Sequence, residues 1–500
     1  MTSLKRAAVR GTVWSALSTV FNRGLRFCVT ILLARLLVPA DFGLIAMTSL
    51  VMDVAQLLRD LGIGAAVIQR QRLDPEHLTT CFWTNQAMGV AMWALTVAIS
   101  PWAAAFYRNA AVQPVLSTLA LSFLIAPIGS IPWILLNREL QFKRLMIAET
   151  LATASRTSLS LVLAWRGAGV WSLVWGSLAG SVTGSVVNWW FCKWRPSFRW
   201  SWRHFQELFR FGRSVFGEKF LGYFAANSDY LVTGRFLGAT VLGYYNFAYE
   251  LPHLAQTHLV PVISRVLFPV FSRLQDDRAR LHRGYLEGLR WLAVVSVPFC
   301  VGLFVTAPEF VPTVYGAKWA PVIAPLQILC LAGLANALTS TVWTAQQAIG
   351  RPDIGFVWNA IGVPLIVGTL LLGARGGILG VATAMLGLTV VRALLIQHIT
   401  NRLIGLSWSR WWNAVRAPLL AGMGMGGVVA SCRMAVIPPT WTTLESLVAM
   451  IGVGVGSYGA LLLWQDRALV SDLRGLLTNT PDVPSPAVAL AGDAPAHGAP

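Results

Sequence analysis

The stretch TVWSALSTVFNRGLRFCVTILLARLLVPADFG (residues 12–43) decides the fold class, because it is long and apolar enough to cross a bilayer. It nevertheless carries Arg23 and Arg26 well inside the apolar run. An arginine near the centre of a membrane helix costs roughly 2.5 to 3.5 kcal/mol on insertion scales, so such residues face protein or water rather than lipid. Their spacing of three places both on one side of a helix. The stretch therefore predicts a membrane helix with a cationic face.

The end of this helix recurs later in the chain. Ala34-Arg35-Leu36-Leu37 followed by Gly43 is echoed by Gly234-Arg235-Phe236-Leu237 followed by Gly243, a shift of 200 positions (235 − 35) without a gap. A further echo relates Pro114-Val115-Leu116 to Pro321-Val322-Ile323, at a shift of 207 (321 − 114). Because the matches keep chain order, we predict an internal duplication.

The composition is that of an integral membrane protein. The 500 residues are 55% hydrophobic and only 12% charged, whereas soluble proteins carry about 25% charged residues. The basic residues behind the net charge of +18 lie in short connections between apolar runs, so we interpret them as topology signals rather than as a nucleic-acid surface. The six cysteines are scattered and predict neither disulfides nor a metal site.

Apolar runs of spanning length predict an all-α integral membrane fold with about fourteen transmembrane helices, arranged as two pseudo-symmetric six-helix lobes plus two C-terminal helices. The predicted parts are an N-lobe (1–192), a basic interfacial cytoplasmic linker (193–210), a C-lobe (211–410), two further spans (411–465) and a mostly disordered cytoplasmic tail (466–500). Glycine-rich stretches at 422–427 and 452–456 predict close helix packing.

The distribution of lysine and arginine predicts the orientation. These residues concentrate in alternate connections, beginning with Lys5, Arg6 and Arg10 at the N-terminus. By the positive-inside rule both termini are expected in the cytoplasm. No connection is long enough for a soluble domain, so the function is expected to reside in the spans themselves.

Charged side chains at membrane depth are the candidate functional residues. The candidates for substrate binding are Arg23, Arg26, Lys219, Arg290 and Arg392, and those for ion coupling or charge pairing are Asp53, Asp229 and Glu250. No acid in the first span is placed to neutralise Arg23 and Arg26, and guanidinium groups bind phosphate oxygens through two parallel hydrogen bonds. We therefore expect an anionic substrate. Whether the acids pair with the arginines or carry a coupling ion is left open.

Three segments carry a resemblance to a known family: DLGIGAAVIQR (60–70), LNRELQF (136–142) and NSDYLVTGRFLG (227–238). They resemble polysaccharide flippases of the Wzx type, in the multidrug/oligosaccharidyl-lipid/polysaccharide exporter superfamily. The resemblance covers roughly residues 1–430. It implies two six-helix lobes around a cationic cavity, and alternating access that moves an undecaprenyl-diphosphate-linked oligosaccharide across the cytoplasmic membrane.

This resemblance implies a transporter that is not an enzyme and has no cofactor, with H⁺ or Na⁺ as candidate coupling ions. The implied setting is the inner membrane during extracellular polysaccharide or O-antigen biosynthesis. The implied partners are the lipid bilayer, the lipid-linked oligosaccharide, and a polysaccharide polymerase with its export machinery, but no nucleic acid. One alternative is a multidrug cation antiporter of the same superfamily. The other, of a different class, is a membrane-embedded polymerase or glycosyltransferase.

Overall fold

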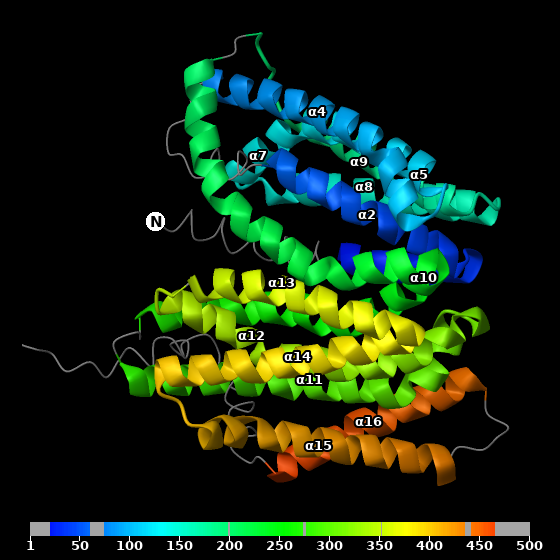
Figure 1. Ribbon diagram of the computed structural model, residues 1–500, viewed down its shortest axis with the longest axis vertical. Coiled ribbons are helices and arrows are strands. Elements are labelled where there is room, and N and C mark those ends of the chain that lie inside the picture. Colours follow the sequence, from blue (N-terminus) through cyan, green and yellow to red (C-terminus); the bar gives the residue numbers. More distant parts are fainter. Residues whose placement is uncertain are drawn as a thin grey trace, which may run out of the picture. The chain divides into compact units, whose positions relative to one another are not determined.

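The computed structural model describes residues 21–60, 75–198, 201–273, 277–351, 353–435 and 442–465, and the regular structure in these ranges is helical (Figure 1). This confirms the predicted all-α class. The helices are the N-terminal helix (21–36), α2 (Pro39–Asp60), α4 (Pro75–Tyr107), α5 (Val112–Leu119), α6 (Ser122–Ile125), η1 (Ala126–Gly129), α7 (Ser130–Arg138), α8 (Phe142–Trp165), α9 (Val170–Phe191), α10 (Trp202–Arg273), α11 (Arg278–Val314), η2 (Ala317–Val322), α12 (Ile323–Ala348), α13 (Asp353–Gly373), η3 (Ala374–Gly376), α14 (Gly377–Ile404), α15 (Trp408–Ala435) and α16 (Thr443–Gln465).

The chain is a multi-pass membrane protein. Within the described ranges, nine helical segments are long and apolar enough to cross a bilayer. The long helix α10 is two helices in succession, because Gly238 between them adopts φ 83°, a left-handed conformation that favours glycine. The figure of fourteen spans stays a prediction.

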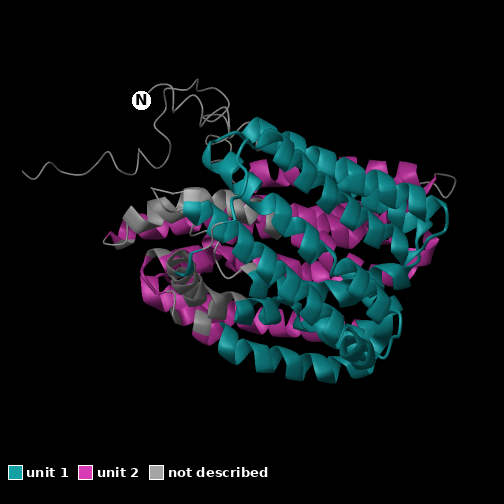
Figure 2. Cartoon of the chain, turned by 90° about the horizontal axis from the view of Figure 1, so that it is seen from above, with its two compact units in different colours: residues 1–246, 359–378 teal, residues 247–358, 379–500 magenta. Residues whose placement is uncertain are grey.

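The chain divides into two compact units, coloured separately in Figure 2. Unit 1 comprises residues 1–246 and 359–378, and unit 2 comprises residues 247–358 and 379–500. The boundary between the units therefore falls inside α10, and α10 itself begins at Trp202, within the segment predicted as an interfacial linker.

The first part of that linker lies against α4 and α9 in unit 1. The Trp83 indole nitrogen donates to the backbone oxygen of Ser197 over 2.9 Å. The Arg195 guanidinium lies 5.1 Å from the centre of the Trp189 ring, and the Trp189 and Trp194 rings are stacked. Tryptophan beside arginine is the composition favoured at the headgroup level of a bilayer.

The duplicated glycines meet in unit 1. A Cβ atom added to Gly43 in α2 would overlap the carbonyl oxygen of Ala239 in α10, and one added to Gly243 would overlap the carbonyl oxygen of Pro39. Pro39 and Ala239 are themselves 200 positions apart, as are the two glycines. Such a reciprocal contact, in which each element meets the counterpart of itself, is the pattern of a two-fold axis. The contact is thus consistent with the internal duplication predicted from the sequence.

In unit 2, α11 packs against α12, α15 and α16. The glycines of α15 allow this approach. A Cβ atom on Gly426 would lie 3.0 Å from Val301 of α11, and one on Gly424 would lie 2.7 Å from Leu461 of α16. The close packing predicted for residues 422–427 is confirmed at Gly422, Gly424 and Gly426, but not at Gly427, which has no neighbouring atom within 4 Å. At 452–456 only the central glycine, Gly454, has neighbouring side chains within 4 Å, so the prediction was wrong for Gly452 and Gly456.

Candidate functional site

Arg26 of the N-terminal helix meets polar side chains of α8 inside unit 1. Its Nη2 atom donates to the Thr153 hydroxyl over 3.3 Å and lies 3.7 Å from a carboxylate oxygen of Glu149. The Arg26 and Glu149 side chains are 51% and 54% exposed, so the pair borders open space rather than a sealed core. Arg156 lies one turn beyond Thr153 on α8, close enough for its charge to interact with that of Arg26. We call these four residues the arginine cluster.

A hydrogen bond beside the cluster fixes how the two helices meet. Asn22, which is buried, donates through its side-chain nitrogen to the Thr150 hydroxyl over 3.2 Å.

Arg26 lies ten residues before the end of its helix at residue 36, which is about 15 Å at 1.5 Å per residue. The hydrocarbon core of a bilayer is about 30 Å thick. The distance is consistent with the mid-membrane depth expected for Arg26 from the sequence.

Glu149 is a partner of Arg26 that the sequence analysis did not identify. No acid within the first span was expected to neutralise Arg23 and Arg26, but an acid from α8, distant in the sequence, pairs with Arg26. Thr153 and Arg156 follow Glu149 by four and seven residues, a spacing that places all three on one face of α8. That periodicity is the signal by which they could have been found. Arg23 is exposed, as Arg26 is.

Asp53 of α2 has a tyrosine as its described partner. The Tyr223 hydroxyl lies 3.2 Å from a carboxylate oxygen of Asp53 and 3.3 Å from the backbone oxygen of Leu50. Tyr223 was missed by the sequence analysis, although it lies four residues after Lys219 on the same helix. Its hydroxyl joins the first helix of α10 to α2.

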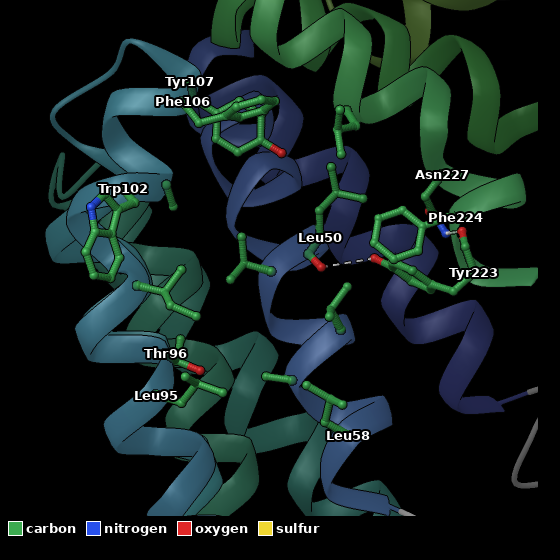
Figure 3. Close-up of a pocket in the computed structure, with 16 residues that line it drawn as sticks. Leu50, Leu58, Leu95, Thr96, Trp102, Phe106, Tyr107, Tyr223, Phe224 and Asn227 are labelled. Atoms are coloured by element: carbon green, nitrogen blue, oxygen red, sulfur yellow. Dashed lines mark hydrogen bonds between the residues drawn. The ribbon is translucent and has the colours of Figure 1, made fainter. Parts of the chain in front are cut away.

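An apolar cavity of about 420 Å³ lies beside this tyrosine, between α2, α4 and α10 (Figure 3). Almost all lining atoms are apolar, and Trp102 and Phe106 at its border are 70% and 41% exposed. Asn227 bonds back to the Tyr223 backbone oxygen over 2.9 Å rather than offering its amide nitrogen to the cavity. The cavity is therefore suited to hydrocarbon and not to sugar.

Asp229 is held across the break in α10. Its carboxylate accepts a hydrogen bond from the Tyr245 hydroxyl over 2.8 Å and one from the backbone nitrogen of Tyr230 over 3.0 Å. The Tyr230 hydroxyl in turn donates to the side-chain oxygen of Asn246 over 3.1 Å. Asp229 is only 1% exposed, so these bonds replace water for a fully buried carboxylate. They also tie together the two helices that meet at Gly238.

The remaining predicted residues lie mostly in unit 2. Arg392 places its guanidinium 5.5 Å from the centre of the Trp358 ring, a cation–π contact. Arg290 is half-buried in α11, and Glu250 lies on an exposed face of α10. The side chain of Lys219 falls outside the described residues. The structure thus brings Arg26 together with α8 in unit 1, while Arg290 and Arg392 belong to unit 2.

The fold is that of a polytopic helical membrane protein, and the arginine cluster places charged groups where the N-terminal helix meets α8. The family model described as "Polysaccharide biosynthesis protein" matches residues 32–324, and the chain belongs to that family. It is 28% identical over 400 residues to the lipopolysaccharide biosynthesis protein WzxC of Escherichia coli (strain K12), covering 79% of this chain and 81% of the relative. It is 29% identical to the teichuronic acid biosynthesis protein TuaB of Bacillus subtilis (strain 168), covering 85% and 89%.

Solved structures share the fold. The lipid II flippase MurJ in an inward closed conformation aligns with a TM-score of 0.73 at 15% identity, over 92% of this chain and 100% of that chain. An inward-facing multidrug resistance transporter of the MATE family, within the MOP superfamily, aligns with a TM-score of 0.61 at 15% identity, over 79% and 98%. Both share the helical transporter fold of this chain.

Proposed function

We propose that this protein is a flippase that moves undecaprenyl-diphosphate-linked oligosaccharides across the cytoplasmic membrane for extracellular polysaccharide or O-antigen biosynthesis, by alternating access. Three similarities support transport of a lipid-linked saccharide: the family match, the fold shared with MurJ, and a further relative. That relative is the succinoglycan biosynthesis transport protein ExoT of Rhizobium meliloti (strain 1021), which is 24% identical over 94% of this chain and 95% of its own length. The protein is a transporter and not an enzyme.

The observation that carries the diphosphate assignment is the arginine cluster. Arg26 and Arg156 supply two guanidinium groups beside a single described acid, Glu149, at a depth where uncompensated charge is costly. A diphosphate offers several oxygen acceptors to those donors and supplies the missing negative charge. The hydrocarbon chain of such a substrate would suit the apolar cavity shown in Figure 3.

The MATE-like fold keeps a cation antiporter as the nearest competing function. A cationic substrate needs acids at its binding site, and the cluster around Arg26 has the opposite balance of charge. In our proposal the acids serve coupling to H⁺ or Na⁺ instead. Asp229 is the foremost candidate because it is a buried carboxylate at a helix break, with Asp53 and Glu250 as the others. A polysaccharide polymerase and export machinery complete the proposed partners.

The test is reconstitution of the purified protein into vesicles that carry a labelled undecaprenyl-diphosphate oligosaccharide. We expect the label to become accessible to an enzyme on the opposite leaflet at a protein-dependent rate. A fluorescent cationic dye serves as the competing substrate. Uptake of the dye without movement of the lipid would contradict the flippase and establish the antiporter.

Both termini and the segment around Ser201 are predicted to face the cytoplasm, because the basic residues concentrate on that side. In a variant without native cysteines, Ser201→Cys is expected to react with a membrane-impermeant thiol reagent only after the cells are opened. An added cysteine in the oppositely placed connection at Arg166 is the matched control and is expected to react in intact cells. Labelling of Ser201→Cys in intact cells would show the orientation to be wrong.

A further inference from the structure

Arg26 lies between a like charge and an opposite charge, both supplied by α8. Glu149 approaches its Nη2 atom to 3.7 Å, while the neighbouring charge of Arg156 acts on it repulsively. Thr153, between them on the same helix face, accepts a hydrogen bond from that Nη2 atom at 3.3 Å. The guanidinium is therefore held in place by a hydroxyl, with the carboxylate as a looser neighbour.

The Arg26–Glu149 pair is weak by its geometry. Its 3.7 Å separation exceeds the 2.7 to 2.9 Å that is typical of a charge-assisted hydrogen bond, and both side chains are about half exposed. Exposed ion pairs of this kind contribute little, whereas a guanidinium fork on a phosphate forms two short charge-assisted bonds. A phosphate that reaches Arg26 would therefore displace Glu149.

The position of Arg156 is set by a close approach of α9. A Cβ atom on Gly180 would lie 3.0 Å from the Cβ atom of Arg156 and 3.1 Å from its Nε atom. A Cβ atom on Gly176 would lie 2.8 Å from the Arg156 carbonyl oxygen. These two glycines bring the α9 backbone against Arg156 and restrict the directions open to its side chain. Arg156 is thus a second guanidinium, held about two turns from Glu149 on the same helix.

We propose that Glu149 is the resident counter-anion of a phosphate site formed by Arg26 and Arg156, and that the phosphate of the substrate displaces it. This inference rests on the proposed function and adds a release mechanism to it. In the empty transporter the carboxylate neutralises Arg26. During release, the carboxylate competes with the phosphate for Arg26. This competition lowers the affinity of the site for the phosphate and speeds the departure of the substrate.

The test compares Glu149→Gln with the wild type, using purified full-length protein in nanodiscs. The probe is undecaprenyl diphosphate, with uncharged undecaprenol as the reference lipid. Removing the competing carboxylate is expected to tighten binding of the diphosphate about twofold to fivefold, to slow its dissociation by a similar factor, and to leave undecaprenol binding unchanged. Glu139→Gln is the matched control: it removes an exposed acid outside the cluster and is expected to bind like the wild type.

The outcomes separate this inference from the proposed function. In one outcome the wild type binds diphosphate, Arg26→Gln binds it more weakly, and Glu149→Gln binds it as the wild type does or more weakly. Glu149 then only positions Arg26, and the counter-anion role is overturned. If the wild type does not distinguish diphosphate from undecaprenol, the phosphate site itself is overturned. Should Glu149→Gln fail to fold, Glu149→Asp is the second variant. Its shorter carboxylate is expected to tighten diphosphate binding by a smaller factor, and unchanged or weaker binding would overturn the role.

Discussion

Replacing Arg26 with lysine is expected to lower transport of the lipid-linked oligosaccharide about tenfold to a hundredfold, while the protein still inserts and folds. Lysine keeps the positive charge but loses the planar fork that bonds two phosphate oxygens at once. Loss of one charge-assisted contact costs on the order of 1.5 to 3 kcal/mol. Arg26→Ala, which also removes the charge, is expected to be worse. Since the Glu149 pair is half exposed, neither change should greatly alter stability.

The measurement is the rate of lipid movement in reconstituted vesicles, with protein level and thermal unfolding recorded in parallel. Arg166→Lys is the matched control, because Arg166 is exposed at the C-terminal end of α8 and outside the arginine cluster. It is expected to transport at the wild-type rate. A double Arg23→Gln, Arg26→Gln variant that inserts normally and transports at the wild-type rate would refute the assignment. The substrate site would then have to be sought near Lys219, Arg290 and Arg392.

Of this cluster, only Arg26 was predicted from the sequence, because two arginines inside an apolar run conflict with lipid and therefore indicate a partner. The identity of the partner could not be predicted. Glu149, Thr153 and Arg156 lie on another helix, and their contact with Arg26 depends on how α8 packs against the N-terminal helix. Periodicity along α8 places them on one face but does not say which helix that face meets.

The acids show the same limit. Asp53 and Asp229 were predicted from their depth as candidates for ion coupling or charge pairing, and their described partners are the hydroxyls of Tyr223 and Tyr245 rather than arginines. A tyrosine in an apolar span is usually interpreted as packing, since its ring is large and its polar atom small. Only the fold shows that these hydroxyls reach carboxylates.

The repeat was the most informative part of the sequence. It relates Gly43 to Gly243 by position but says nothing about their distance in space, because two copies of a motif need not touch. In the structure the two helices approach closely at these positions, and no side chain fits there. The glycines are thus explained by a backbone contact that a linear pattern does not contain.

Adding a single methyl group at this contact is therefore expected to have a large effect. In Gly43→Ala the new Cβ atom would overlap the Ala239 carbonyl oxygen, and in Gly243→Ala it would overlap that of Pro39. Backbone atoms cannot move aside as a flexible side chain can, so the helices must separate. We expect each variant to lose about 3 kcal/mol or more of stability, at or above the upper end of ordinary overpacking, or to lose transport because the contact no longer closes.

Thermal unfolding and the transport rate measure this effect, and two other helical glycines supply the controls. Gly24 and Gly222 have open space where a Cβ atom would stand. Alanine at either is expected to be neutral or to stabilise by up to about 1 kcal/mol through its higher helix propensity. Wild-type stability and transport in Gly43→Ala would show that the two helices do not meet as described.

The double variant Gly43→Ala, Gly243→Ala tests the two-fold relation itself. Because both methyl groups act on one pair of helices, the first substitution already separates them and the second should add little. We therefore expect the two single variants to lose similar amounts of stability. The double variant should lose clearly less stability than the sum of the two single losses, since the effects of neighbouring substitutions are not additive. Additive losses would mean that each glycine faces a different, independent neighbour, which a reciprocal contact between duplicated helices excludes.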